Sequence, residues 1–261
     1  ENIDSGKKVN IFKFPVPKWH EDDGGRFIGT GHVLITKDPD TGEVNLGTYR
    51  VQAHDATTTG LHISTAKHGW NHIKKYHDRG QAAPILLSIG HHPLVLGMGA
   101  SPIEEGGEYN YLGAIMGQPF DVIEEEITGI PMPADSEIVL AGWCPPDKTR
   151  TEGPFGEFTG YYASGARPDW IIEVQRVYHR NDPILLGAPP GRGRNEHSYW
   201  TALMQSASVQ NDLEKAGVVG VRGAWSHEIG GGLFLVVAIK QTYGGHSKEA
   251  GLFAMQLLSR S

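Results

Sequence analysis

Short apolar runs bounded by glycine and proline constrain the fold of this chain more than any other feature. "APILLSIG", "HPLVLGMG" and "SEIVLAGW" have the length of core strands, and "PDWIIEVQRVYHR" alternates apolar and polar residues. "RFIGTGHVLITKDPDTGEVNLGTYRVQAH" adds two β-rich runs joined by "DPDTGE", which is made of residues that turns prefer. The first two-thirds of the chain is therefore predicted to be mostly β-structure.

Helical patterns interrupt this β-structure and then dominate the end of the chain. "STAKHGWNHIKKYHDRG" predicts a helix that begins at Ser64 or Thr65 and ends at Gly80, and "EEGGEYNYLGAIMG" predicts a shorter one. Further on, helical "SYWTALMQSASVQNDLEKAG" is followed by strand-like "VVGVRGAW" and "GLFLVVAIKQ", and "SKEAGLFAMQLLSRS" begins another helix. This alternation is typical of α/β organisation. We expect a domain boundary in the Pro/Gly-rich connection near residues 180–190.

Composition restricts the environment and the partners of the protein. The net charge of −7 argues against a nucleic-acid partner, which requires a basic surface. No apolar run approaches the ~20 residues that span a membrane, so no membrane association is expected. The single cysteine, Cys144, fits a reducing cytoplasm. Because the chain begins with Glu1 and not with methionine, it is expected to be processed or part of something longer.

Two carboxylates in "TEGPFGEFTGYY" pose a conformational question. Glu152 and Glu157 flank a Gly-Pro-Phe-Gly sequence that breaks a helix interior. In a regular strand their odd spacing would send the two side chains to opposite faces. If both acids point the same way, the backbone must bend, and glycines permit such a bend. The alternative is a surface loop with two solvated acids.

A second set of polar residues suggests a metal site. Asn45, His68 and Glu108 supply an amide oxygen, an imidazole and a carboxylate, which suit Mn²⁺ or Mg²⁺ better than a thiol-based zinc site does. The choice is one among 13 histidines, and His72 lies at helical spacing from His68. The catalytic zinc signature is not met, because Gly69 occupies the position of its glutamate.

Five stretches together resemble the UbiD family of prenylated-flavin-dependent decarboxylases. "NLGTYR", "KH", "GEYNYLGA", "EGPFGEFTGYY" and "IKQTYGGHSKEAG" occur in that family's order and rough spacing, and the similarity covers essentially the whole chain. Family members are much longer, with a domain before this region and a continuation after it. The resemblance implies an α+β chain. A split β-barrel domain resembling flavin reductases is expected at residues 1–182, and the beginning of an α/β domain at 183–261.

The resemblance also implies roles for individual residues. Asn45, His68 and Glu108 correspond to ligands of a divalent metal that bridges to the flavin phosphate. The segment before Glu108 is one residue shorter than in some relatives, so Glu104 or Glu105 is the alternative carboxylate. The residues expected to contact the cofactor are Thr48, Tyr49, Arg50, Thr65, Ala66, Lys67, His68, Lys240 and Lys248. The two last lysines lie beside glycines before a helix, where a lysine can hold a phosphate or be a solvated surface residue.

The resemblance implies catalytic roles for Arg50, Glu152 and Glu157. Prenylated FMN takes up electrons, so positioning and protonation are left to the protein. Arg50 and Glu152 are expected to pair, with Glu157 as the proton donor. A neighbouring carboxylate favours the protonated form of such a donor. We therefore expect reversible decarboxylation of an aromatic, heteroaromatic or α,β-unsaturated acid, releasing CO₂. The expected ions are Mn²⁺ or Mg²⁺, and K⁺. The flavin prenyltransferase UbiX is expected to supply the cofactor, and the complete protein is expected to be a homo-oligomer.

Two other functions stay open at this point. A flavin reductase or FMN-binding protein would share the split barrel, since a fold does not determine function. A reductase needs a nicotinamide site, however, and the chain has no convincing one. An isolated domain without activity is the second alternative. "WHEDDGGRFIGTGH" also has family character, and part of it is expected near the substrate or the flavin, or else to form only a charged turn before a strand.

Overall fold

A computed structural model describes residues 1–101, 103, 105–230 and 233–258 of the chain. The chain divides into two compact units. The first holds Glu1–Glu157 and Tyr161–Pro190, and the second holds Phe158–Gly160 and the chain from Gly191 onward. The boundary expected after residue 182 lies within the last segment of the first unit. No helix in the described residues is long and apolar enough to cross a membrane.

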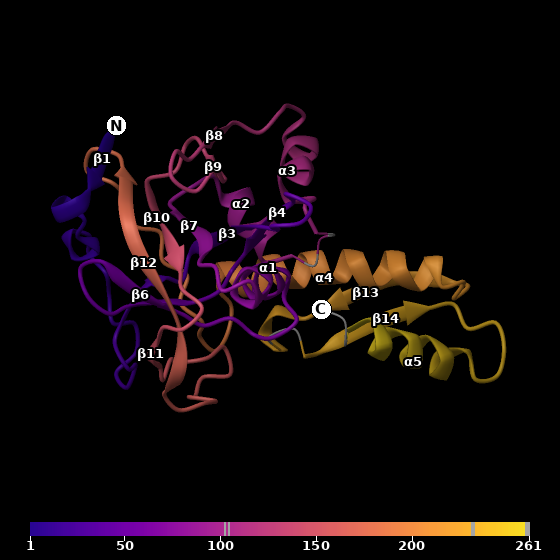
Figure 1. The fold of residues 1–261 in the computed structure, drawn as a ribbon. Coiled ribbons are helices and arrows are strands. Elements are labelled where there is room, and N and C mark those ends of the chain that lie inside the picture. Colours follow the sequence, from indigo (N-terminus) through magenta and orange to yellow (C-terminus); the bar gives the residue numbers. More distant parts are fainter. Residues whose placement is uncertain (102, 104, 231–232, 259–261) are drawn as a thin grey trace. The chain divides into compact units, whose positions relative to one another are not determined.

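The first unit is built on a large antiparallel sheet (Figure 1). Its main path runs β2-β5-β6-β12-β10-β7-β3-β4, and β1 and β11 also pair with β12. The strands are β1 (Asn2–Ser5), β2 (Arg26–Gly29), β3 (His32–Lys37), β4 (Val44–Gly47), β5 (Val51–Ala53), β6 (Thr58–Leu61), β7 (Ala83–Ile89), β10 (Ile138–Cys144), β11 (Thr149–Glu152) and β12 (Arg167–His179).

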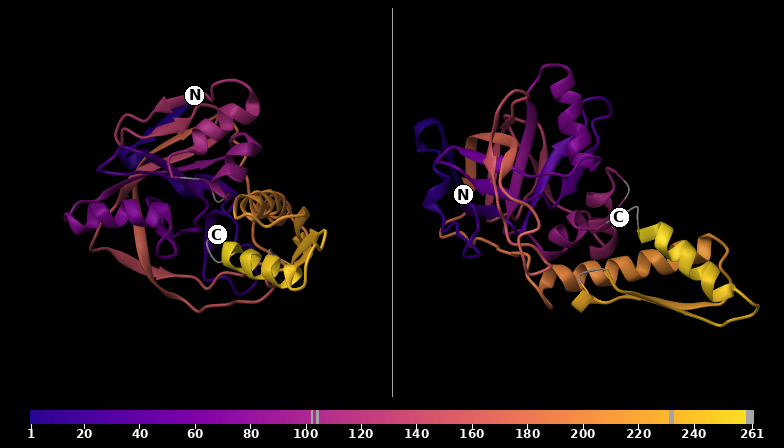
Figure 2. Two further views of the ribbon diagram at one scale, coloured as in Figure 1. Left: turned by 90° about the vertical axis from the view of Figure 1, so that its right-hand side faces the viewer. Right: turned by 90° about the horizontal axis from the view of Figure 1, so that it is seen from below.

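The long strand β12 is where the sheet curls into a half-barrel (Figure 2). Its first part pairs with β6 and β11, and its later part pairs with β10 and β1. The register between β10 and β12 shifts at Ala141/Gly142. A Cβ at Gly142 would lie 2.2 Å from the Glu173 carbonyl oxygen, so glycine is required at this bulge. The predicted α+β class with an antiparallel split-barrel unit is confirmed.

Local sequence explains the hairpin of β3 and β4. The predicted turn forms at "DPDTGE", where the Asp38 carboxylate accepts hydrogen bonds from the N–H groups of Asp40 and Thr41. Every residue of β7 is buried, which matches its uninterrupted apolar sequence. The core of the unit gathers side chains such as Ile28, Leu34 and Leu87 from the sheet.

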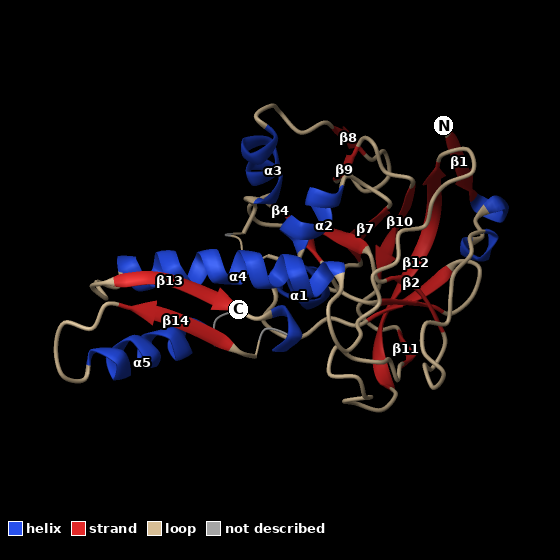
Figure 3. Cartoon of the chain, turned by 180° about the vertical axis from the view of Figure 1, so that it is seen from behind, coloured by secondary structure: helices blue, strands red, loops and turns tan. Residues whose placement is uncertain are grey.

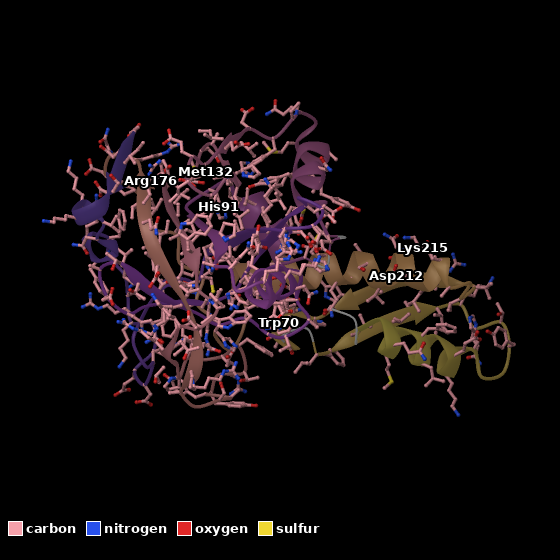
Figure 4. All side chains as sticks on the ribbon, viewed as in Figure 1. Trp70, His91, Met132, Arg176, Asp212 and Lys215 are labelled. Atoms are coloured by element: carbon pink, nitrogen blue, oxygen red, sulfur yellow. The ribbon has the colours of Figure 1, made fainter. Side chains whose placement is uncertain are left out.

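Helices α1 (His68–Asp78), α2 (Pro93–Gly99) and α3 (Glu108–Met116) complete this part of the fold. Helix α1 packs on β3, β4 and β7 and carries Trp70, which Figure 4 labels. The Trp70 ring stacks on that of Trp170 in β12. It begins at His68 and not at Ser64 or Thr65, because Ala66 adopts a left-handed backbone with φ 67°.

The strand predicted at "HPLVLGMG" is wrong, because this segment forms α2. Pro93 occupies the first helical turn, where its missing N–H is harmless, and the His92 ring accepts a hydrogen bond from Leu94 N–H. The buried side chains Val95 and Met98 are three residues apart, as one helix face requires. A short apolar run does not by itself distinguish a strand from a buried helix.

Short elements connect these pieces. Two 3-10 turns, η1 (Gly6–Lys8) and η2 (Ile11–Lys13), follow β1, and a small hairpin pairs β8 (Val122–Glu124) with β9 (Pro131–Pro133).

The second unit is an antiparallel hairpin with two helices (Figure 3). Helix α4 (Glu196–Lys215) precedes β13 (Val221–Ser226), the turn η3 (Glu228–Gly230) and β14 (Leu235–Ile239), and α5 (His246–Leu258) follows. Asn195 and Ser198 form a capping box at the start of α4. The core of this unit contains Val209, Leu213, Val218, Ala250 and Ala254.

Candidate active site

Arg50 lies between β4 and β5 and binds both glutamates of the predicted pair. Its Nε atom donates a 2.8 Å hydrogen bond to Oε1 of Glu152, and its Nη2 atom donates a 2.8 Å hydrogen bond to Oε2 of the same carboxylate. Its Nη1 atom donates a 3.1 Å hydrogen bond to Oε1 of Glu157. We call these three residues the Arg50 network. Two parallel bonds to one carboxylate form the strongest geometry available to an arginine.

The segment from Glu152 to Glu157, here named the glutamate loop, bends as the spacing requires. Glu152 ends β11, and Gly153 adopts a φ of 77°, which favours glycine. The chain then turns back so that both carboxylates meet Arg50. Glu152 is fully buried and the Glu157 side chain is 27% exposed. These burials exclude the alternative of a surface loop with two solvated acids.

The surroundings keep the Arg50 side chain charged and oriented. Its Cζ atom lies 5.4 Å from the centre of the Phe155 ring, and that ring packs on Phe27. Burial by itself would lower the pKa of the Arg50 guanidinium. Bonding to Glu152 and the charges of Glu152 and Glu157 outweigh this effect and raise that pKa above its usual value. A permanent cation therefore stands between the two acids.

Sequence reasoning missed a neighbouring histidine–aspartate pair. His62 Nδ1 lies 2.8 Å from Oδ2 of Asp169, and the Arg167 guanidinium contacts the same ring. One ligand-type atom from each of His62, Glu152 and Asp169 lies within 4.8 Å of the others. The pairing of Leu61 with Trp170 places His62 and Asp169 on one face of the sheet. His62 and Asp169 are far apart in the sequence, so their proximity can be inferred only from the register of the paired strands.

A cavity of about 480 Å³ opens beside this pair. Its volume is in the range of small-molecule sites. It is lined by Leu61, Ile63, Ser64, Thr65, Trp70, Thr149, Arg167, Pro168, Asp169 and Trp170. It thus combines an apolar wall with charged groups next to the Arg50 network.

Two of the predicted metal ligands gather around Tyr49. The Tyr49 hydroxyl interacts with the side chain of Asn45 and the backbone of Gly69, and the Tyr49 ring leaves no room for a Cβ at Gly69. Glu108, the first residue of α3, is buried, and the Leu46 N–H bonds its carboxylate. Burial raises the pKa of Glu108 to about 7 and also raises the pKa of Tyr49.

Unpaired polar atoms at this position fit a hard cation. Among the described residues, Asn45 Nδ2 and Glu108 Oε2 are buried without a hydrogen-bond partner. The amide of Asn45 can present nitrogen or oxygen in the same space, so it can turn its oxygen toward a metal. His68 begins α1 directly before Gly69, beside this cluster. The assignment of the three as ligands stays a prediction.

The alternative carboxylates are engaged elsewhere or lie outside the described residues. Glu105 Oε1 is 2.6 Å from His72 Nε2, and His72 Nδ1 is 3.0 Å from Thr36 Oγ1. Asp38 completes a group of possible metal ligands with these two, but Lys75 pairs with its carboxylate. Glu104 is not among the described residues. Glu108 therefore remains the better candidate, and His72 is satisfied without a metal.

The other residues predicted to contact the cofactor are divided between the two units. Thr48 and Tyr49 lie between β4 and β5, and Thr65, Ala66 and Lys67 precede α1. Lys240 follows β14 and Lys248 lies in α5, so both belong to the second unit. Their contacts with a flavin stay predictions.

Comparison with known proteins gives a consistent result. The sequence profile of the UbiD family, described as the 3-octaprenyl-4-hydroxybenzoate carboxy-lyase Rift-related domain, matches residues 1–193. A phenolic acid decarboxylase of Sedimentibacter hydroxybenzoicus is 33% identical over 263 residues, which are 97% of this chain and 53% of that protein. A pyrrole-2-carboxylic acid decarboxylase of Pseudomonas aeruginosa is 31% identical over 84% of this chain and 44% of that protein.

A solved structure resembles the whole chain. The UbiD-class enzyme HmfF from Pelotomaculum thermopropionicum, in an evolved dimeric form in complex with prFMN, superposes with a TM-score of 0.90 at 28% identity. The match covers 100% of this chain and 60% of that one. The chain spans about half the length of the curated relatives that it matches.

Proposed function

The chain belongs to the UbiD family, and from this premise we propose that it is part of a carboxy-lyase acting on an aromatic or heteroaromatic carboxylic acid with prenylated FMN. The observation that carries the proposal is the bidentate pairing of Arg50 with the buried Glu152, with Glu157 on the same guanidinium. The names of the relatives, which decarboxylate phenolic and pyrrole carboxylic acids, support this substrate class.

The residues of the first unit would hold the cofactor and its metal. Prenylated FMN, when bound, supplies the electron sink for the carbon that loses CO₂. The unpaired buried atoms of Asn45 and Glu108, with His68 beside them, would hold Mn²⁺ or Mg²⁺. Thr48, Tyr49 and the Thr65–Lys67 segment would contact the flavin. K⁺ as an additional ion is part of the same proposal.

The protein's own task is to deliver a proton. Decarboxylation breaks the bond from the ring carbon to the carboxylate carbon, and a C–H bond replaces it, so each turnover consumes one proton. Glu157 suits the donor role because a single arginine N–H holds it and its partial exposure allows it to regain a proton from solvent. Glu152, fully buried and held by two bonds, would orient Arg50. The reverse reaction, carboxylation, would use the same groups.

The complete protein would have a cofactor supplier, an oligomeric state and a cellular location of its own. UbiX would supply the prenylated flavin, the complete protein would be a homo-oligomer, and it would act in the cytoplasm. All three rest on family membership and on the sequence. A flavin reductase is disfavoured by the paired glutamates, whereas an inactive isolated domain is the alternative that requires a direct experiment.

The test is reconstitution of the full-length protein by co-expression with UbiX. An ultraviolet–visible spectrum would establish cofactor loading, and pyrrole-2-carboxylate and vanillate would serve as probes in D₂O. The expected result is release of CO₂ and one deuterium at the former carboxyl position of the product. Oxidation of NADH without decarboxylation would support the reductase. A loaded protein that does neither would contradict both activities, whereas turnover by the full-length protein that residues 1–261 alone do not show would support the inactive isolated domain.

A further inference from the structure

The segment from His20 to Gly25, just before β2, packs directly on the glutamate loop. Gly24 N–H donates a 2.7 Å hydrogen bond to the Pro154 carbonyl oxygen. A Cβ at Gly24 would lie 1.9 Å from the Gly153 carbonyl oxygen, so no side chain fits there unless the loop moves. Likewise, a Cβ at Gly156 would lie 2.4 Å from the His20 ring. Glycine at positions 24 and 156 therefore allows the two segments to lie this close together.

Asp23 is the charged group in this contact. It is only 4% exposed, although an aspartate is rarely buried without partners. Its Oδ2 accepts a 2.9 Å hydrogen bond from His20 N–H, within its own segment. Its Oδ1 accepts a 2.9 Å hydrogen bond from Gly156 N–H, across the contact. The buried carboxylate thus joins the two segments through backbone groups alone.

The position of Gly156 makes this bond consequential. Its peptide unit leads directly into Glu157, whereas Glu152 at the other end of the loop is held by β11 and by two bonds to Arg50. At the Glu152 end, Gln52 Oε1 also accepts a 2.8 Å hydrogen bond from Gly153 N–H. At the Glu157 end, the Asp23 side chain holds the Gly156 amide, and Glu157 N–H donates a 3.2 Å hydrogen bond to the Tyr161 carbonyl oxygen.

We propose that Asp23 is a positioning residue, which fixes the Gly156 peptide so that the Glu157 carboxylate meets Arg50 and the reacting carbon at the correct distance. We call the hydrogen bond from Gly156 N–H to the Asp23 carboxylate the clamp. The effect of the clamp on catalysis rests on the proposed function, whereas the existence of the clamp does not. Displacement of a reacting group by about 1 Å can lower the rate ~10²-fold. The position of the Asp23 carboxylate, not only its charge, is the property that matters.

The test compares Asp23→Ala, Asp23→Asn and Asp23→Glu with Asp22→Ala in the full-length, cofactor-loaded protein. Asp22 is the matched control, because it is adjacent, of the same type and exposed. Hydrogen–deuterium exchange of the peptide spanning residues 153–158 is the readout that is independent of activity. In Asp23→Ala the Gly156 amide loses its acceptor, so its exchange should accelerate roughly 10-fold. In Asp22→Ala it should not change.

Kinetics then separate positioning from folding. We expect Asp23→Ala to lower kcat roughly 10²-fold with little change in KM or in the flavin spectrum. Asp23→Asn keeps one oxygen for Gly156 N–H, while its NH₂ group replaces the oxygen that accepts from His20 N–H, so it should recover much of kcat. Asp23→Glu keeps the charge but moves the carboxylate by one methylene, so it should remain slow. If Asp23→Ala does not fold, the contrast between the Asn and Glu variants still decides the question.

Each result has a defined meaning. Unchanged exchange at Gly156 in Asp23→Ala would overturn the clamp, whatever the enzyme does. Faster exchange with an unchanged kcat, or an Asp23→Glu variant as fast as the parent, would overturn the positioning role. If the parent protein decarboxylates no acid when loaded, the proposed function fails, while the exchange data still decide whether the clamp exists.

Discussion

The guanidinium of Arg50 is held to the fully buried carboxylate of Glu152 by two hydrogen bonds of 2.8 Å each. The two residues are 102 positions apart in the sequence, so their contact links the connection between β4 and β5 to the end of β11. Glu157 contacts the same cation from a partly exposed position. This difference in burial gives the two glutamates different consequences when either is changed.

The first prediction concerns stability. Glu152→Gln should lower the free energy of unfolding by roughly 3 kcal/mol, because it leaves a buried guanidinium without its paired charge. Glu157→Gln should change it by less than about 1 kcal/mol, since Glu157 is partly exposed, is held by a single hydrogen bond and leaves the Arg50–Glu152 pair intact. Urea unfolding of the two variants beside the parent chain measures both values. Equal losses in the two variants would contradict the assigned difference in burial.

The second prediction concerns catalysis in the full-length, loaded protein. Glu157→Gln should reduce turnover by ~10²–10⁴-fold, the usual effect of losing a positioned general acid. Flavin binding, followed by its spectrum, should persist. Because the Arg50 network acts as a unit, combining Glu152→Gln with Glu157→Gln should cost little more than the worse single variant. Near-normal deuterium incorporation by Glu157→Gln would assign the donor role to another group.

The third prediction concerns the metal. Glu108→Gln should weaken Mn²⁺ binding by at least ~10-fold, whereas Glu105→Gln, which changes the carboxylate bonded to His72, should not. Calorimetric titration with Mn²⁺ measures both. A ligating carboxylate must be deprotonated, and burial raises the pKa of Glu108 to about 7. Mn²⁺ binding should therefore tighten as the pH rises through about 7. The opposite ranking of the two variants would move the site to Glu105.

The fourth prediction concerns acid sensitivity. Burial lowers the pKa of His91, two residues after β7 (Figure 4), from 6.5 to about 4. The unfolded chain therefore binds a proton at His91 between pH 6.5 and 4, whereas the folded chain does not. The contribution of neutral His91 to stability is fully present above pH 6.5 and is lost as the pH falls.

His91→Gln should remove this part of the pH dependence. The gap in unfolding free energy between parent and variant should change by roughly 2 kcal/mol between pH 7 and pH 5. Burial also raises the pKa of Glu108 to about 7, so Glu108 makes the free energy of unfolding fall as the pH rises through this range. The parent chain alone would therefore show only the sum of the two effects, and the comparison with the variant is needed. His227→Gln, in the second unit, controls for the loss of an imidazole. A gap that stays constant with pH would show that His91 titrates normally.

Much of this protein is determined by local sequence. The "DPDTGE" turn, the buried strand β7, the helix α4 and the bend at Gly153 follow from turn residues, apolar periodicity and the freedom of glycine. The order of the five family-like stretches was sufficient to indicate the family. The turn, the strand, the helix and the bend each depend on residues that are close in the sequence, so a sequence read in short windows contains them.

Only the tertiary structure decided which groups meet. Three contacts join residues more than 100 positions apart in the sequence. They are the pairing of Arg50 with the buried Glu152, the pairing of His62 with Asp169, and the hydrogen bond that Gly156 N–H donates to Asp23. Segment α2 shows the same limit, because its apolar run fits a strand or a helix until its neighbours are known. Strand register and packing determine these contacts. Neither is encoded by local periodicity, since a shift of one residue in register exchanges the two faces of a strand.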